Sequence, residues 1–345
     1  MKLALLIGVG SVGKRHLDKL SNKYDLVYAV DPNKKAREFV VDEFPSTVML
    51  SDTKELKQTL PVGSRIDCAI IANWASDRAS TIKDLEKYKV DRFLFEKPLA
   101  SSLLDIQRIE RIVRRFKAFA MVNLHLRHSQ IPQIISDVTE KYALGNIISI
   151  VEHGGAKCFG TNGIHWLDLA SHLIGERPNL VSAKVEFDSI SPRGPQFLVA
   201  EGFGVWSYPG GAKFHLIYSN SSSTPSVFRI QWKHAMGTII DGVMSIEIQT
   251  SKIENPNSPI TRTPNYDLKL EFHDIFFEEE AEGTFGRVHD FLLNQEPSLE
   301  HYSNSSKDLL CAFISSASNK DIDLSKKELL ALRHMKLFRR DWQIT

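Results

Sequence analysis

The first third of the chain alternates short apolar stretches with segments in which apolar residues recur at helical spacing. The apolar stretches predict strands at Lys2–Ile7, Asp25–Val30, Thr47–Leu50, Ile66–Asn73, Arg92–Phe95 and Ala118–Asn123. The segments between them predict helices that include Asn33–Phe44, Ser76–Lys89 and Ser101–Phe116. Continuous apolar strands suit a parallel sheet that is covered on both faces. The alternation therefore predicts a doubly wound α/β domain.

After about residue 145 the pattern changes to successive strands with turn residues between them. The expected strands are Ile147–Glu152, Leu180–Asp188, Gln196–Trp206, Ala212–Ser219, Ser226–His234, Met244–Gln249 and Asp267–His273. Most intervals are too short for crossover helices, so antiparallel pairing is expected. Helical patterns return at Glu278–Leu293 and Ser306–Ser318. We expect one domain over residues 1–122 and a second, α+β domain over residues 123–345.

The composition narrows the class of protein. A length of 345 residues suggests two domains, because single cores seldom grow beyond about 250–300 residues. Lys and Arg (43) nearly balance Asp and Glu (42), which disfavours nucleic-acid binding and a polybasic membrane anchor. The cysteines Cys68, Cys158 and Cys311 form neither a disulfide framework nor a metal-binding CxxC pair. No apolar run approaches the ~20 residues of a membrane span, so we expect a soluble, cytoplasmic protein.

A glycine motif follows the first expected strand, as Gly8-Val9-Gly10-Ser11-Val12-Gly13. In this pattern the first glycine permits a tight turn, the second admits a pyrophosphate, and the third allows the helix to pack closely. Asp31 ends the second strand, where a carboxylate would accept hydrogen bonds from ribose and repel a 2′-phosphate. The motif predicts NAD as cofactor. Lys14 and Arg15 keep NADP as the alternative, and ordinary turn glycines beside a capping aspartate are the structural alternative.

Candidate chemistry first appears after the fifth expected strand, at Phe95-Glu96-Lys97-Pro98. The carboxyl ends of parallel strands line the cofactor crevice, so Lys97 should project near the nicotinamide. Its ammonium group could hydrogen-bond a substrate oxygen and stabilise a developing alkoxide. The alternative is an exposed loop lysine.

A second group of polar residues lies on an expected helix between Asn162 and Gly175. His165, Asp168 and His172 occur there at positions i, i+3 and i+7, which places them on one helix face. His172 could act as general base, because histidine titrates near neutral pH, and Asp168 could orient the substrate or the base. A structural histidine or a metal site is the alternative, although the metal site lacks cysteine ligands and an HExxH pattern. We expect no metal.

These motifs together resemble the Gfo/Idh/MocA family of oxidoreductases. The resemblance rests on the glycine motif, Asp31, Glu96-Lys97-Pro98, the segment Asn123-Leu124-His125-Leu126-Arg127, Leu144-Gly145-Asn146-Ile147, and the spacing of Asp168 and His172. It implies a nicotinamide-dependent sugar or polyol oxidoreductase with an N-terminal Rossmann domain. It further implies an open-faced, mainly antiparallel C-terminal sheet with helices on one face, whose exposed face forms a homodimer or tetramer. By this resemblance Lys97, Asp168 and His172 are catalytic, and Glu96 lies near the nicotinamide ribose.

The chain departs from the family pattern after the fourth strand. Asn73 and Trp74 replace the usual Thr-Pro, and Arg78 stands where the family commonly has histidine. We expect Asn73 and Trp74 to adjoin the cofactor, although Trp74 could instead fill space beneath it. The residues expected to face a sugar-type substrate are Asn123, His125, Arg127, Lys157, Asn162, His165 and Trp166. Polar donors around an aromatic face suit a carbohydrate.

Three functions remain open from the sequence. The first is oxidation or reduction of a secondary hydroxyl or keto carbon of a sugar, amino sugar, polyol or nucleotide sugar. The second is a non-catalytic sensor or scaffold that binds a dinucleotide, which would have no need of Lys97 and an Asp–His pair. The third retains NAD for transient oxidation during elimination, epimerisation or glycoside cleavage.

Overall fold

The computed structural model describes residues 1–155, 157–188, 197–240, 243–249, 268–274, 277–333 and 343–344. Contacts divide the chain into two compact units. The first unit comprises Met1–Asn123, Gly286–Leu310 and Leu332–Gln343. The second comprises Leu124–Phe285, Cys311–Ala331 and Ile344–Thr345. The first unit thus takes in two segments that lie beyond the range 1–122 expected for the N-terminal domain.

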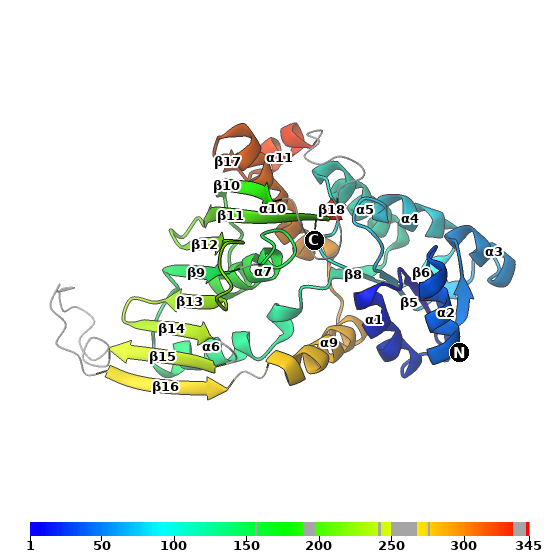
Figure 1. The fold of residues 1–345 in the computed structure, drawn as a ribbon, viewed down its shortest axis with the longest axis horizontal. Helices are drawn as coiled ribbons and strands as arrows, with labels where there is room; N and C mark the ends of the chain where they lie inside the picture. Colours follow the sequence, from blue (N-terminus) through cyan, green and yellow to red (C-terminus); the bar gives the residue numbers. More distant parts are fainter. Residues whose placement is uncertain are drawn as a thin grey trace. The chain divides into compact units, whose positions relative to one another are not determined.

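The first unit contains a six-stranded sheet in the order β3-β2-β1-β5-β7-β8, in which all neighbouring strands are parallel. Its strands are β1 (Leu3–Ile7), β2 (Leu26–Val30), β3 (Val48–Leu50), β5 (Cys68–Ile71), β7 (Arg92–Phe95) and β8 (Phe119–Val122). Every residue of β1 and β5 is buried, as expected for strands covered on both faces. The predicted doubly wound Rossmann sheet is confirmed (Figure 1).

The helices of this unit connect the strands. They are α1 (Ser11–Ser21), α2 (Lys34–Glu43), α3 (Leu56–Thr59), α4 (Arg78–Asp84) and α5 (Leu103–Phe116), with 3₁₀ turns η1 (Thr53–Glu55) and η2 (Leu85–Lys87) and a small pair of strands β4 (Arg65–Ile66) and β6 (Lys89–Val90). Helix α5 shows why the local sequence folds this way. The Ser102 side chain caps its start by accepting a hydrogen bond from the Asp105 N–H, and Lys117 ends it in a left-handed conformation.

Residues from late in the chain complete the first unit. The N–H of Ala120, on the edge strand β8, donates to the carbonyl oxygen of Pro297 at 3.0 Å. The N–H of Leu99 donates to the hydroxyl of Ser306, also at 3.0 Å. Both late residues lie in or next to helix α10 (Leu299–Ser318), which begins before the expected start at Ser306.

The second unit contains a mixed, mainly antiparallel sheet in the order β16-β15-β14-β13-β9-β12-β11-β10-β17, and β18 pairs with β11. The strands are β9 (Ser149–Gly154), β10 (Leu180–Asp188), β11 (Phe197–Ser207), β12 (Lys213–Tyr218), β13 (Val227–Gln231), β14 (Ala235–Ile240), β15 (Val243–Gln249), β16 (Leu268–Asp274), β17 (Ile322–Asp323) and β18 (Gln343–Ile344). The mainly antiparallel sheet is confirmed. Two features were not expected: β14 is a separate strand, and β9 runs parallel to β12. The long connection between β9 and β12 makes a parallel crossover possible.

One face of this sheet is buried. Alternate residues of β12 point into it, namely Phe214, Leu216 and Tyr218. Helix α7 (Gly163–Ile174) packs there, since a Cβ atom on Gly163 would lie 2.4 Å from the Leu216 side chain. The remaining helices of the unit are α6 (Ile131–Lys141), α11 (Lys326–Leu332), the 3₁₀ turn η3 (His125–His128), the start of α9 (Phe277–Asn294) and the end of α10.

The opposite face carries a row of five apolar residues and one histidine across six strands. The row, defined by register, runs through Phe203, Ile217, His153, Val227, Ile240 and Val243. Phe203 is 46% exposed, and Ile240 and Val243 are 41% and 44% exposed. We call this set the exposed apolar row. Large apolar side chains at such exposure are typical of surfaces that another molecule covers.

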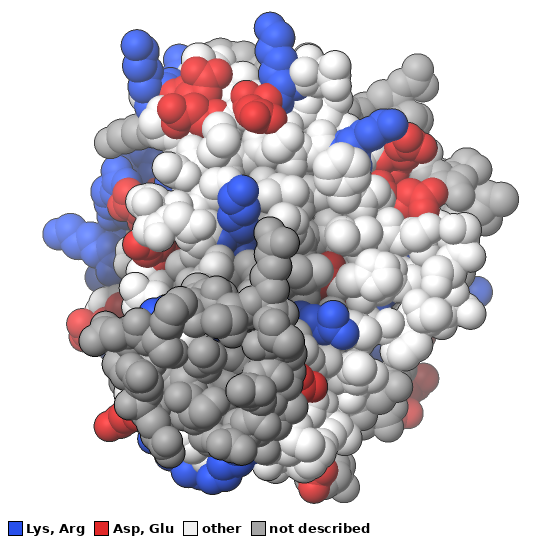
Figure 2. Space-filling model, turned by 90° about the vertical axis from the view of Figure 1, so that its left-hand side faces the viewer, with Lys and Arg blue, Asp and Glu red and all other residues white. Residues whose placement is uncertain are grey.

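The molecular surface shows charges of both signs. On the face drawn in Figure 2, Lys and Arg side chains are interspersed with Asp and Glu, and neither sign forms a continuous area among the residues described. No helix in the described part of the chain has the length and apolar character that a membrane span requires.

Candidate functional site

The glycine motif forms the turn between β1 and α1. Gly8 has a φ of +94°, and a Cβ atom there would lie 2.7 Å from the backbone of Ala72. A Cβ atom on Gly13 would lie 2.1 Å from the Gly8 carbonyl oxygen, so this helix must begin close to the strand. Gly10, the N-cap of α1, has open space where a Cβ would be, and its helix start has no side-chain cap. A helix N-terminus of this kind fits a pyrophosphate.

Asp31 ties the end of β2 to this loop. Its Oδ2 accepts a hydrogen bond of 2.6 Å from the Val9 N–H, and its Oδ1 accepts one of 2.8 Å from the Asn33 N–H. Each carboxylate oxygen has a second lone pair, so ribose hydroxyls can still be accepted. Arg37 donates to the carbonyl oxygens of Asp31 and Pro32. The contact of Asp31 with ribose stays a prediction.

Two buried amide oxygens mark the same edge of the sheet. Asn73 follows β5 and Asn123 follows β8, and the Oδ1 atom of each has no hydrogen-bond partner among the described residues. Buried polar atoms without partners are rare in proteins. Together with the glycine cradle, they indicate that the residues present fit a dinucleotide. Trp74, next in the chain, is 48% exposed.

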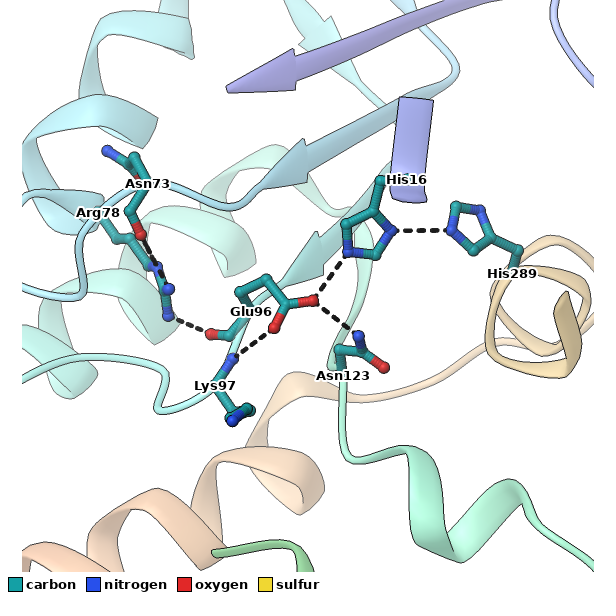
Figure 3. Close-up of polar contacts among 7 residues, drawn as sticks. All are labelled: His16, Asn73, Arg78, Glu96, Lys97, Asn123 and His289. Carbon is teal, nitrogen blue, oxygen red and sulfur yellow. Dashed lines mark hydrogen bonds and ion pairs between the residues drawn. The ribbon is translucent and has the colours of Figure 1, made fainter. Parts of the chain in front are cut away.

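Glu96 is buried at the end of β7 and accepts hydrogen bonds on both oxygens (Figure 3). Oε1 lies 2.8 Å from His16 Nε2 and 2.7 Å from Asn123 Nδ2. Oε2 lies 3.4 Å from the Lys97 backbone nitrogen. Burial alone would raise the pKa of Glu96. The hydrogen bond and charge of His16, the amide of Asn123 and the charge of Lys97 outweigh it and hold the pKa at about 2.

Arg78 fixes the same loop from the other side. Its guanidinium is buried and donates to the carbonyl oxygens of Asn73, Glu96 and Pro98. Burial lowers the pKa of Arg78 to about 10, which leaves it charged at neutral pH. Arg78, in the position where the family commonly has histidine, thus connects the loops that follow β5 and β7 through hydrogen bonds.

Lys97 lies between these two anchors. Its side chain is half-buried and, in Figure 3, extends away from the Glu96 carboxylate. The Glu96 carboxylate accepts a hydrogen bond from the Lys97 N–H, and Arg78 donates to the carbonyl oxygens of the residues on either side of Lys97. The backbone at Lys97 is therefore held on both sides.

In the second unit, helix α7 presents Asp168 to Arg127. The N-cap Asn162 accepts a hydrogen bond of 3.2 Å from the Cys158 N–H, and Gly175 ends the helix with a φ of +77°. Asp168 is fully buried, with its Oδ2 at 2.6 Å from Arg127 Nε and its Oδ1 against Arg127 Nη2. A bidentate pair of this kind is strong and directional. Arg127, which was predicted to bind substrate, therefore pairs with Asp168, which was predicted to be catalytic.

The turn η3 lies along α7. The rings of His125 and His165 are 4.1 Å apart between centroids. His128 also belongs to this group: burial lowers its pKa to about 3, and the charges of Arg127, His172 and His125 act in the same direction. His165 is buried like Asp168, whereas His172, in the last turn of α7, is exposed. The three residues predicted to share one helix face thus differ in their access to solvent.

The other predicted substrate residues lie nearby in the chain. Trp166 is buried and stacks on Phe228 of β13, with ring centroids 4.7 Å apart, so its indole lies between helix and sheet. Lys157 is half-buried and Asn162 is exposed. Whether these residues contact a substrate stays a prediction.

The structure brings together two groups of predicted residues. In the first unit these are Asn73, Glu96, Lys97 and Asn123, and in the second they are His125, Arg127, His165 and Asp168. That Lys97 meets Asp168 and His172 over one ring stays a prediction, because these residues belong to different units. Within the described residues, no group of three or more His, Cys, Asp or Glu side chains could hold a metal ion.

Four polar residues of the two units were not singled out from the sequence, namely His16, His128, Glu152 and His289. Arg78 was noted as a departure from the family pattern, but its hydrogen bonds to buried carbonyl oxygens were not predicted. His16 had a detectable signal, because with Gly13, Leu17 and Leu20 it occupies the buried stripe of α1. A histidine in such a stripe needs a buried partner. His289 lacks a local signal, since its partner His16 lies 273 positions away in the chain.

Comparison with known proteins identifies the family of the N-terminal domain. The family described as "Oxidoreductase family, NAD-binding Rossmann fold" (GFO_IDH_MocA) matches residues 2–124. The N-terminal domain belongs to this oxidoreductase family. The predicted resemblance is confirmed for this domain, and with it dinucleotide binding as a family property.

Solved structures extend the likeness in fold to nearly the whole chain. An oxidoreductase from Agrobacterium radiobacter, solved with NAD⁺, L-tartaric acid and magnesium, has a TM-score of 0.72 at 16% identity, covering 93% of this chain and 98% of its own. Myo-inositol 2-dehydrogenase from Lactobacillus plantarum has a TM-score of 0.68 at 16% identity, covering 94% and 99%. A super-repressor mutant of Gal80p from Saccharomyces cerevisiae has a TM-score of 0.71 at 10% identity, covering 94% and 98%. At these identities the likeness concerns the fold.

Proposed function

We propose that this chain is an NAD-dependent dehydrogenase or reductase that acts on a secondary hydroxyl or keto carbon of a sugar, amino sugar, polyol or nucleotide sugar. The observation that carries the proposal is the anchoring of Lys97. It follows β7 at the carboxyl edge of a parallel sheet, where dinucleotides bind, and two buried charged side chains, Glu96 and Arg78, hold its backbone. Such anchoring suits a group that must be positioned for chemistry.

Each residue has a distinct role in this proposal. A bound nicotinamide ring would supply the hydride acceptor or donor. Lys97 hydrogen-bonds the substrate oxygen and stabilises its developing negative charge. His172, exposed on α7, takes the hydroxyl proton in the oxidative direction. Asp168, bound to Arg127, orients the substrate or the base from a fixed position.

The substrate class rests on the polar residues of the second unit and on the neighbours. His125, Arg127, Lys157, Asn162 and His165 offer donors of the kind that carbohydrate hydroxyls meet. Structural neighbours include myo-inositol 2-dehydrogenase and levoglucosan dehydrogenase. Both names refer to enzymes that act on polyhydroxylated compounds.

A regulatory function is the second candidate, favoured by the likeness to the repressor protein Gal80p. Such a protein would bind the dinucleotide without turnover. A third candidate retains NAD for transient oxidation during elimination, epimerisation or glycoside cleavage. Measuring NADH release per turnover separates net oxidation, which releases one equivalent, from transient oxidation, which releases none.

The decisive experiment is a screen of the purified full chain with NAD against sugars, polyols and nucleotide sugars, following the absorbance of the reduced cofactor. With the substrate found, Lys97→Ala should lower kcat by about 100-fold or more, because a transition-state donor is lost. Its affinity for NADH should stay within about twofold, since the glycine loop is intact. Lys57→Ala, an exposed lysine on α3, is the matched control. Near-normal turnover in Lys97→Ala would contradict the assigned role.

The choice of NAD over NADP rests on Asp31, whose carboxylate would repel a 2′-phosphate. Fluorescence titration should give a lower dissociation constant for NADH than for NADPH, and the reverse order would refute the assignment. Gly10→Ala sharpens this test. The space around its Cβ is open, so the variant should fold normally, yet the added methyl group should weaken dinucleotide binding.

We also propose that the exposed apolar row forms the contact between copies in a homodimer or tetramer. The row spans six strands, and burying such a surface against a second copy of the chain removes its apolar side chains from water. Light scattering should give an oligomer for the wild-type chain and a monomer for Ile217→Glu. Val62→Glu, at an exposed apolar residue of the first unit, is the control. A monomeric wild-type chain at micromolar concentration would exclude this role.

A cytoplasmic location is part of the same proposal. Cys68, Cys158 and Cys311 are all buried, and none of them is part of a disulfide. Cysteines kept as thiols suit a reducing compartment. Fractionation of the source cells tests this, and recovery of the protein outside the cytoplasm would contradict it.

A further inference from the structure

A chain of hydrogen bonds connects helix α9 with the loop that carries Lys97 (Figure 3). His289 Nε2 lies 2.9 Å from His16 Nδ1, and His16 Nε2 lies 2.8 Å from Glu96 Oε1. The other oxygen of Glu96 faces the Lys97 backbone nitrogen. All these residues belong to the first unit, and the side chains of His289, His16 and Glu96 are buried.

The charge of Glu96 determines which atom donates and which accepts in each of these hydrogen bonds. An ionised carboxylate only accepts hydrogen bonds, so His16 must donate through Nε2–H. In a neutral His16 ring, Nδ1 is then the acceptor, and His289 must donate to it through Nε2–H. His289 is neutral, because burial lowers its pKa to about 3, with the charges of His16, Lys23 and Lys19 acting in the same direction. If His16 carries a proton on both nitrogens, it donates to Glu96 and to His289, and His289 then accepts through Nε2 and holds its own proton on Nδ1. In either charge state of His16, the hydrogen bonds restrict each ring to one arrangement.

The surroundings provide few other anchors for Glu96. On the side of His289 lie Lys19 of α1 and Lys23, which follows the end of this helix, and Lys23 is paired with Asp290 of α9. Among the described residues, the other side-chain hydrogen bond to Glu96 comes from the amide of Asn123. The carboxylate position therefore depends on two side-chain donors, one of which is held by His289.

Two buried imidazoles are costly compared with the apolar residues that fill the rest of the α1 stripe. Burying polar groups is unfavourable unless they are hydrogen-bonded, and packing alone would be served by leucine or phenylalanine. The arrangement is explained if the hydrogen bonds themselves matter, because they transmit a fixed orientation from α9 to the loop after β7.

We propose that His289 and His16 are positioning residues for Lys97. By fixing the Glu96 carboxylate as the acceptor of the Lys97 N–H, they set the direction in which the lysine side chain leaves the backbone. Neither histidine needs to touch the substrate. This inference rests on the proposed function, since it assigns the two histidines to the reaction of Lys97.

Replacement of His289 tests this role. His289→Leu removes the donor to His16 and should lower kcat about tenfold while the KM for the dinucleotide stays within about twofold, since small displacements of catalytic groups are costly. His289→Gln, whose amide nitrogen can replace Nε2–H, should recover most of the loss. A purely structural role would lower the thermal midpoint of both variants without this selective effect on kcat. Equal kcat in His289→Leu and the wild type would overturn the proposal.

A second measurement needs no substrate. Long-range ¹⁵N–¹H spectra of the full chain labelled at histidine nitrogen report each ring's tautomer, and the signals are assigned by their loss in His16→Gln and His289→Gln. We expect Nε2–H on His16, with Nε2–H on His289 where His16 is neutral and Nδ1–H on His289 where His16 is doubly protonated. Nδ1–H on a neutral His16 ring would overturn the relay, whatever the activity. Expected tautomers without turnover on any substrate would instead confirm the relay and contradict the proposed function.

Discussion

Each of the two units buries a glutamate, and the two glutamates have opposite pKa shifts. Glu96 in the first unit accepts hydrogen bonds from His16, Asn123 and the Lys97 N–H, which hold its pKa at about 2 despite burial. Glu152 on β9 in the second unit accepts one bond of 3.0 Å from the Tyr218 hydroxyl, and its Oε2 has no hydrogen-bond partner among the described residues.

Burial raises the pKa of Glu152 to about 7, and the Ser226 hydroxyl, the Lys157 charge and the Tyr218 hydroxyl offset this only in part. The comparison teaches that burial does not decide the charge of a carboxyl group here. The number and kind of donors decide it. Another buried carboxylate, Asp168, has a full cationic partner in Arg127.

Removing that cationic partner should have the largest effect. Arg127→Met leaves the Asp168 charge buried without its guanidinium and should lower the free energy of unfolding by about 3–5 kcal/mol. Urea denaturation measures this loss. The double variant Arg127→Met/Asp168→Leu removes both charges and should regain most of the stability. A loss below about 1 kcal/mol in the single variant would show that the pair contributes little.

Exchange of each glutamate for glutamine sharpens the comparison. Glu96→Gln should cost about 2 kcal/mol at neutral pH, because the amide group cannot accept from both sides and the charge-assisted bonds are lost. Glu152→Gln should change the free energy of unfolding by less than about 1 kcal/mol, since its partners are the neutral hydroxyls of Tyr218 and Ser226, to which an amide oxygen can also bind. Equal losses in the two variants, measured by urea denaturation, would break the contrast.

The pH dependence of stability gives the most specific effect. The pKa of Glu152 is raised from 4.5 to about 7, so the folded state binds a proton that the unfolded state releases between these values. Its contribution to stability should therefore fall as pH rises from about 4.5 through about 7, by on the order of 1–3 kcal/mol. Comparing urea denaturation of the wild type and Glu152→Gln at several pH values isolates this contribution. An identical pH slope in both proteins would contradict it.

The fold of the first unit was predictable in detail because buried parallel strands read as continuous apolar stretches. The expected strand Arg92–Phe95 agrees with β7 at both ends. The second sheet was less predictable from the sequence. The strand β14, Ala235–Ile240, is short and follows β13 closely, and the parallel pairing of β9 with β12 depends on tertiary contacts. Alternation along a strand does not reveal its neighbours.

The candidate site divides in the same way. The glycine motif and Lys97 are recognisable locally, because spacing and strand context carry the signal. The contact of His16 with His289 joins residues 273 positions apart, and no local pattern indicates it. Arg127 and Asp168 were each identified from the sequence, but their mutual pairing was not, since it requires η3 to lie along α7.

The late residues that complete the first unit have a consequence for how the protein is made. While the ribosome is still translating the second sheet, the nascent N-terminal domain lacks Pro297 and Ser306, the latter 207 positions after its partner Leu99. Until they emerge, the backbone of β8 stays open along its outer edge, and open edges invite pairing with other chains. A fragment that ends at Asn123 should therefore aggregate, and a chaperone that shields this edge would have its greatest value during synthesis.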